Sequence, residues 1–226
     1  MLISIADVLT REQVGHCRSL LETTNWVDGA LTSGEQARQV KDNLQVPPES
    51  AVARELGDLI LRALGRNGPF NSFALPLKVL PPLFNRYDLG MSFGAHVDGA
   101  IRALPGGPRM RADVSSTLFL SDPDEYDGGE LVIEDSYGDH QVKLPAGHMV
   151  VYPTTSLHRV APITRGRRWA SFFWSQSMVK DEARRGVLYE MDTAIIRLRQ
   201  ELPDDHPAVL KLVNTYNNLL RLWAEM

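Results

Sequence analysis

The sequence predicts a mostly β protein, a double-stranded β-helix (jelly roll) with N-terminal helices and a C-terminal helical hairpin. Between residues 77 and 178, Gly, Pro and Asp break short apolar runs about every ten residues, a pattern typical of antiparallel sandwiches and barrels. On either side, apolar residues recur at spacings of three and four, which indicates helices. We therefore expect an N-terminal helical flank packed on the core (1–76), a jelly roll (77–178) and a C-terminal helical region (179–226).

The N-terminal flank is expected to be mostly helical over residues 10–64. Thr10 followed by Gln13 fits a capping box, in which two side chains and two backbone N–H groups satisfy one another. A second apolar stripe begins at Val52, and Gly65 is placed to end that helix.

The core is expected to hold about eight strands, a number that suits a double-sheet jelly roll. The stretch 99–112 between them is predicted to be an irregular loop, and a loop of that length is usually functional or mobile. Arg102, Arg109 and Arg111 make it basic, so it is either a lid that guides an anionic substrate or a solvated loop. The predicted strands lie near 78–87, 92–98, 113–121, 129–135, 139–144, 148–153, 156–162 and 167–177.

The C-terminal region carries two apolar helical stripes, over 187–198 and 209–223, with Pro203 and Pro207 between them. This pattern predicts a helical hairpin packed on the barrel. The stripe that ends at Trp223 belongs either to the core or to a contact between subunits, so a homo-oligomer stays open.

Composition narrows the class of protein. The chain has 226 residues, 43% of them hydrophobic, and a formal net charge of −4, which gives no general attraction to nucleic acid or anionic membranes. Its one cysteine, Cys17, cannot form an internal disulfide, which favours a reducing compartment. No apolar run approaches the roughly 18 residues of a membrane span, and the start lacks a basic signal segment. We expect a cytoplasmic protein with no nucleic-acid or membrane partner.

His96 and Asp98 are the first candidates for chemistry. Residues i and i+2 of a strand point to the same face, so one imidazole and one carboxylate project together. They are two of the three ligands of the 2-His-1-carboxylate site of non-haem iron oxygenases, although His-x-Asp also occurs often by chance. The third ligand must come from another strand. The candidates are the other histidines: His16, His140, His148, His158 and His206. Of these, His158 alone lies in a strand-rich stretch late in the barrel.

Arg168 lies in the strand that follows His158, and its neighbour Arg167 should point to the opposite face. An arginine fork binds a carboxylate through two parallel hydrogen bonds, which suits the anchoring of 2-oxoglutarate beside an iron. From the residues alone, Arg168 could equally be a surface arginine.

Three stretches carry a more specific signal: FNRYDLGMSFGAHVDGA, STLFLSDPDEYDGGELVIED and LPAGHMVVYPTTSLHRVAPITRGRRWASFFW. They resemble the Fe(II)/2-oxoglutarate dioxygenases of prolyl 4-hydroxylase type and, more narrowly, the bacterial PKHD-type hydroxylases. The resemblance spans almost the whole chain and departs at His148, where the family pattern has an acidic residue. It implies iron at His96, Asp98 and His158, 2-oxoglutarate held by Arg168 and contacted by Tyr87, and ascorbate as a reductant.

The implied activity is hydroxylation of an unidentified substrate, with release of succinate and CO2. A protein side chain, a peptide, a free amino acid or a siderophore-related compound would fit, the last by analogy with a family role in iron uptake. Two other classes remain open at this point. One is a non-catalytic jelly roll that binds a metal or small ligand, and the other is a zinc hydrolase, because zinc accepts the same ligands. Neither explains an anchoring arginine.

Overall fold

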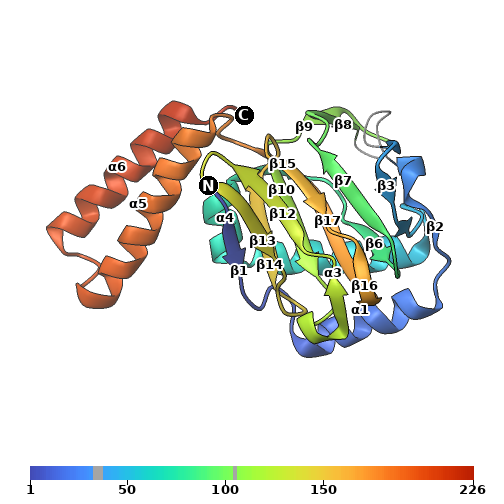
Figure 1. Ribbon diagram of the computed structural model, residues 1–226. Coiled ribbons are helices and arrows are strands. Elements are labelled where there is room, and N and C mark those ends of the chain that lie inside the picture. The colour runs from blue at the N-terminus through green and yellow to red at the C-terminus, as the bar shows by residue number, and fades with distance from the viewer. Residues whose placement is uncertain (33–37, 104–105) are drawn as a thin grey trace.

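The computed structural model describes residues 1–32, 38–103 and 106–226 of the chain. Two antiparallel β sheets face each other, helices cover the outer side of the larger sheet, and a helical hairpin projects from one end (Figure 1). The predicted mostly β jelly roll with helical flanks is therefore confirmed. None of the helices in these described ranges is long and apolar enough to cross a membrane.

The two sheets are built from strands that lie far apart in the sequence. The larger sheet has the order β1 (Ile3–Ile5), β14 (Met149–Pro153), β10 (Val114–Phe119), β17 (Arg168–Ser177), β6 (Leu83–Tyr87), β4 (Leu44–Gln45) and β2 (Val27–Asp28), and β5 (Pro76–Val79) also pairs with β17. The smaller sheet has the order β13 (Gly138–Val142), β12 (Leu131–Asp135), β15 (Leu157–Val160), β7 (Ser92–His96) and β3 (Lys41–Asp42). Two short pairs complete the strands, β8 (Ile101–Ala103) with β9 (Arg109–Arg111) and β11 (Tyr126–Gly128) with β16 (Ile163–Gly166).

The N-terminal helices cover the outer face of the larger sheet. Helix α1 (Arg11–Thr23) begins with the predicted capping box: the Gln13 N–H donates to Thr10 Oγ1, and the Thr10 N–H donates to Gln13 Oε1. Helices α3 (Ala51–Gly65) and α4 (Gly68–Ala74) follow, and all three bury apolar side chains against the sheet. Short 3₁₀ turns lie at η1 (Gly29–Thr32) and η2 (Pro123–Glu125).

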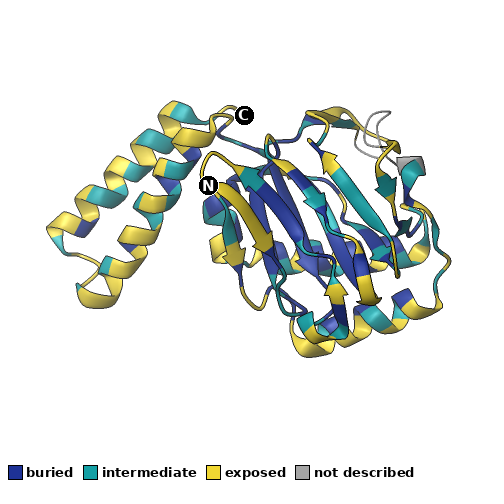
Figure 2. Ribbon diagram, in the orientation of Figure 1, coloured by how far each residue is buried: buried dark blue, intermediate teal, exposed yellow. Residues whose placement is uncertain are grey.

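Strand β17 shows how the layers are made. Its alternate side chains Trp169 and Phe173 join the core beneath the helices, whereas Arg168, Phe172 and Trp174 point to the other face, as the period of two requires. There they meet a cavity between the two sheets. The central strands are buried on both faces, as the dark ribbons of Figure 2 show.

The C-terminal helices α5 (Glu182–Glu201) and α6 (Pro207–Trp223) form the predicted hairpin. At the base of the hairpin, Leu188 and Trp223 pack on two residues of the main body. Leu75 directly follows α4, and Val179 lies just after β17. The far end of the hairpin projects away from the sheets (Figure 1). Trp223 therefore belongs to a small core.

Two expectations about the strands and the N-terminal flank are wrong. The expected helical character of residues 10–64 fails between α1 and α3, where β2, β3 and β4 lie. Two-residue strands carry no readable period, and here they form because β4 pairs with β6 and β3 pairs with β7. The single strand expected over 78–87 is divided into β5 and β6, because Pro81 and Pro82 cannot donate to a ladder.

The expectation of an irregular loop over 99–112 is also wrong. Strands β8 and β9 pair, with Arg102 opposite Met110. Met110 is buried in a small cluster with Trp174, and this packing anchors the hairpin where its sequence shows no alternation. Residues 104 and 105 of the stretch lie outside the described residues. The division of the chain at 76/77 and 178/179 stays a prediction.

Candidate metal centre and its cavity

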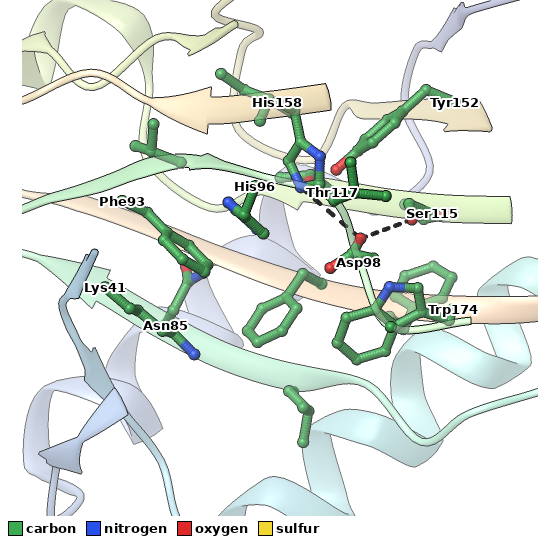
Figure 3. A pocket seen from close by; sticks show the side chains of 18 of the residues that line it. Lys41, Asn85, Phe93, His96, Asp98, Ser115, Thr117, Tyr152, His158 and Trp174 are labelled. Atoms are coloured by element: carbon green, nitrogen blue, oxygen red, sulfur yellow. Dashed lines mark hydrogen bonds and ion pairs between the residues drawn. The ribbon is translucent and has the colours of Figure 1, made fainter. Parts of the chain in front are cut away.

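Strands β7 and β15 bring His96, Asp98 and His158 together. His96 lies directly opposite His158 in this antiparallel pair, and their ring centres are 4.3 Å apart. Asp98 follows β7 by two residues and turns back toward both rings (Figure 3). One ligand atom from each residue lies within 4.8 Å of the others, which is close enough for all three to bind one metal ion. Of the histidines that the sequence left open as a third ligand, His158 is thus the one that lies beside His96 and Asp98.

The remaining histidines lie elsewhere. His16 Nε2 is 3.0 Å from Glu55, His140 Nε2 is 2.7 Å from Asp135, and His206 Nδ1 accepts the Ala208 N–H at the start of α6. His148, the departure from the family pattern, has its Nε2 3.5 Å from Asp7 Oδ1.

Hydrogen bonds orient both imidazoles in the same way. His96 Nδ1 donates to the Gly94 carbonyl at 2.8 Å, and His158 Nδ1 donates to the Ser156 carbonyl at 3.0 Å. Because a carbonyl only accepts, each Nδ1 carries the proton and each Nε2 keeps its lone pair for a metal. Burial, followed by the nearby His158, lowers the pKa of His96 below its usual value, which keeps the ring neutral.

Two side chains hold the carboxylate of Asp98. Ser115 Oγ, on β10, donates to Asp98 Oδ2 at 2.9 Å, and Arg102 Nη2, on β8, lies 3.4 Å from Oδ1. The one hydroxyl proton of Ser115 goes to Asp98, so Ser115 Oγ accepts from Thr154 Oγ1 at 3.0 Å, and this second hydrogen bond fixes its position. Neither residue is marked by a sequence motif, and only the strand parity of β10 could have placed Ser115 on the cavity side.

A cavity of about 380 Å³ runs past the three candidate ligands. Its buried end is formed by Tyr87, Thr117, Tyr152 and Arg168, each less than a tenth exposed. The end nearer to solvent, called the exposed end below, is formed by five other lining residues, of which Trp174 is itself buried: Lys41, Phe93, Arg102, Phe172 and Trp174. Val97 and Ile101, about half exposed, lie where this end opens to solvent.

Arg168 dominates the buried end. It is 1% exposed, and its Nε and Nη1 have no hydrogen-bond partner among the described residues. Its guanidinium lies 5.1 Å from the centre of the Phe119 ring and 5.4 Å from that of Tyr87, its opposite residue on β6. A buried cation with unused donors is costly unless a ligand pairs with it, so this site is suited to a carboxylate. Arg167 points the other way, as predicted, with its Nε 2.5 Å from Asp88 Oδ1.

Tyr87 and Tyr152 supply hydroxyl groups beside Arg168. Burial raises the pKa of Tyr87 to about 12, and Arg168 opposes that shift only in part. Burial likewise raises the pKa of Tyr152. Both hydroxyls therefore stay protonated at neutral pH and are available as hydrogen-bond donors.

Comparison with known protein families places these residues in context. The 2OG-Fe(II) oxygenase superfamily matches residues 82–176, and the C-terminal domain of PKHD-type hydroxylases matches residues 181–225. Among curated proteins, a PKHD-type hydroxylase of Cupriavidus metallidurans is 66% identical and one of Gluconobacter oxydans is 64% identical. In both cases the alignment covers 100% of this chain and 100% of the relative.

Solved structures with the same fold are more distant in sequence. A prolyl-4-hydroxylase of Pseudomonas putida aligns with a TM-score of 0.55 at 20% identity, over 77% of this chain and 92% of its own. HygX of Streptomyces hygroscopicus, with nickel, 2-oxoglutarate and hygromycin B bound, aligns with a TM-score of 0.54 at 17% identity, over 79% and 84%. At this identity the likeness concerns the fold alone.

Proposed function

Because this chain belongs to the PKHD-type hydroxylases of the 2OG-Fe(II) oxygenase superfamily, we propose that His96, Asp98 and His158 hold its Fe(II) and that Arg168 holds 2-oxoglutarate. It is a 2-oxoglutarate-dependent hydroxylase, as the sequence resemblance predicted. The observation that carries the residue assignment is the buried Arg168, with two unused donors, in the same cavity as the His-Asp-His cluster.

The donor set fits iron. Two neutral imidazoles and one carboxylate form the facial triad of non-haem Fe(II) oxygenases, a set that leaves open positions for other ligands. The carbonyl partners of both Nδ1 atoms and the Ser115 hydroxyl on Asp98 fix the three donors before a metal arrives. Such partners typically matter almost as much as the ligands themselves.

Bound iron would supply the activation of oxygen, coupled to conversion of 2-oxoglutarate to succinate and CO2 and to hydroxylation of a substrate C–H bond. The residues of the protein bind the co-substrate and keep water out of the cavity. Arg168 binds the carboxylate of 2-oxoglutarate that lies farther from the metal, and the Tyr87 hydroxyl donates a further hydrogen bond to that co-substrate. Leu131 and Val160 line the same cavity and exclude water from it.

The substrate, reductant and location are further parts of the proposal. Amino-acid side chains, peptides and siderophore-related compounds all remain candidate substrates, and the last would connect the protein with iron uptake. Ascorbate is proposed as the reductant. A cytoplasmic location is supported by the single, fully buried Cys17. A zinc hydrolase or a non-catalytic metal-binding jelly roll would leave the Nε and Nη1 donors of Arg168, which have no partner among the described residues, without a role.

The test combines metal binding with turnover. Protein loaded anaerobically with Fe(II) should consume oxygen and form succinate when 2-oxoglutarate is added, and zinc-loaded protein should not. His96→Ala and Asp98→Ala should each lose metal affinity by more than the roughly 10- to 100-fold expected for an outer partner. His140→Ala is the control, because this exposed histidine pairs with Asp135 and is not among the described residues that line the cavity. Retained iron affinity in both ligand variants would contradict the assignment.

A further inference from the structure

The exposed end of the cavity has an aromatic wall. Phe172 and Trp174 lie on the same face of β17, with ring centres 5.5 Å apart and planes nearly perpendicular. Phe93 stacks on the ring of His96 at 3.6 Å and extends this wall to the candidate metal ligands (Figure 3). Such a surface provides flat apolar contacts for the body of a small organic molecule.

Two cations lie against this aromatic wall. The guanidinium carbon of Arg102 is 3.7 Å from the centre of the Trp174 ring, and its buried Nε has no hydrogen-bond partner among the described residues. The Lys41 side chain points into the cavity from the opposite side (Figure 3), with Nζ 5.4 Å from the Phe93 ring centre and 5.8 Å from that of Phe172. Cation–π attraction to these rings favours the positions of both charged groups.

These two cations repel each other across the cavity. Burial, and next the positive charge of Arg102, lowers the pKa of Lys41 to about 8. An anion that lies between two such groups relieves this repulsion and replaces the water that each has lost.

The charge balance of the cavity also favours an anion. Among its described lining residues, Lys41, Arg102 and Arg168 are cationic, and Asp98 is the acidic one. Arg102 Nη2 lies 3.4 Å from Asp98 Oδ1, a long contact for a hydrogen bond. A metal ion on Asp98 would take up most of that carboxylate's charge and leave the Arg102 guanidinium for another anion.

From these contacts we infer that the exposed end binds the carboxylate of an organic anion between Lys41 and Arg102, with the apolar body of that anion against Phe172 and Trp174. The inference rests on the proposed function, because it places this molecule as the hydroxylated substrate beside the metal. It narrows the candidate substrates to those with a carboxylate close to a planar or apolar group.

Benzoate is a suitable probe, with benzamide as its neutral counterpart and acetate as a carboxylate without an apolar body. Binding is measured by titration calorimetry under argon, on nickel-loaded protein saturated with 2-oxoglutarate, so that neither turnover nor the Arg168 site interferes. Benzoate should bind more tightly than either benzamide or acetate. Arg102→Gln and Lys41→Gln should each weaken benzoate binding about 10- to 100-fold, the loss expected for a hydrogen bond to a charged group.

Arg109→Gln is the matched control, because Arg109 is exposed on the same β8–β9 hairpin and does not line the cavity. It should leave benzoate affinity unchanged, and benzamide binding to Arg102→Gln shows that this variant keeps its fold. Equal affinity for benzoate and benzamide, no binding of benzoate, or no effect of Arg102→Gln would each overturn the inference. Failure to bind 2-oxoglutarate in the first step would instead count against the proposed function.

Discussion

The two ends of the cavity are built differently. The buried end, with Tyr87, Thr117, Tyr152 and Arg168, lies on strands β6, β10, β14 and β17 at the centre of the larger sheet. At the exposed end, the aromatic residues Phe172 and Trp174 also lie on β17, but the two cations do not: Lys41 lies on the two-residue edge strand β3 and Arg102 on the separate β8–β9 pair. The difference teaches that the fold itself fixes the proposed co-substrate site, whereas short peripheral elements decide what else can bind. Each prediction below tests that contrast.

The largest effect is expected at Arg168. Arg168→Gln should weaken 2-oxoglutarate binding about 30- to 1000-fold, since loss of one partner of a buried charge pair costs roughly 2–4 kcal/mol. Titration of the nickel-loaded protein measures this, with the exposed Arg167→Gln as control. Unchanged 2-oxoglutarate affinity in Arg168→Gln would show that the buried end is not the site that holds this co-substrate.

The same residue allows a second measurement without any metal. In the absence of a ligand, the Arg168 guanidinium is a buried cation, and two of its nitrogens have no partner in the part of the chain that the structure describes. Arg168→Met should therefore leave the ligand-free protein at least as stable as the parent, because an apolar side chain avoids that desolvation cost. Chemical denaturation checks this, and a clear loss of stability would mean that the cation already contributes to the fold.

Ser115 should show a smaller effect, on the metal. Ser115→Ala removes the hydrogen bond to Asp98 Oδ2 and should weaken Fe(II) or Ni²⁺ binding about 10- to 100-fold. Ser116→Ala is a matched control, because the neighbouring hydroxyl has no hydrogen-bond partner among the described residues. Equal metal affinity in both variants would show that Asp98 is oriented by Arg102 instead.

Two glycines test how tightly each end is packed. Gly129 has a φ of +67°, and a Cβ there would collide with Ile163 Cδ1 and lie 3.2 Å from Arg168 Cδ. Gly129→Ala should therefore cost about 2–4 kcal/mol of unfolding free energy, from backbone strain and overpacking. At Gly99, beside the exposed end, a Cβ would be 3.9 Å from Arg102 Cζ, so Gly99→Ala should change stability by less than about 0.5 kcal/mol. Chemical denaturation of the two variants measures the difference in their free energies of unfolding.

The same contrast explains what the sequence could predict. Strands 113–121, 148–153 and 167–177 were predictable because they are long and lie at the centre of the sheet, where burial shows in the pattern. Parity along such a strand also turned Arg168 away from Arg167. For His96 and Asp98 the predicted proximity holds for a different reason: β7 ends at His96, two residues short of the predicted strand end, and Asp98 turns back toward the two rings. The short strands β3 and β8 were not predictable, because they exist only through pairing with distant residues. Lys41 reaches the cavity because β3 pairs with β7, and no local pattern encodes that contact.

The last expected effect concerns Lys41 and the dependence of stability on pH. Its pKa of about 8 in the folded protein lies below the usual 10.5, so between these values the unfolded chain binds more protons than the folded one. Stability should therefore rise with pH from about 8 to about 10.5, by at most about 1.4 kcal/mol per pH unit for one proton. Lys41→Met should remove this contribution, and the exposed Lys78→Met should not. Denaturant melts at pH 7, 8, 9 and 10 measure the slopes. If the free energy of unfolding depends on pH in the same way in the parent and in Lys41→Met, the exposed end holds the charged Lys41 at no cost in stability. Repulsion between Lys41 and Arg102 would then not favour an anion there.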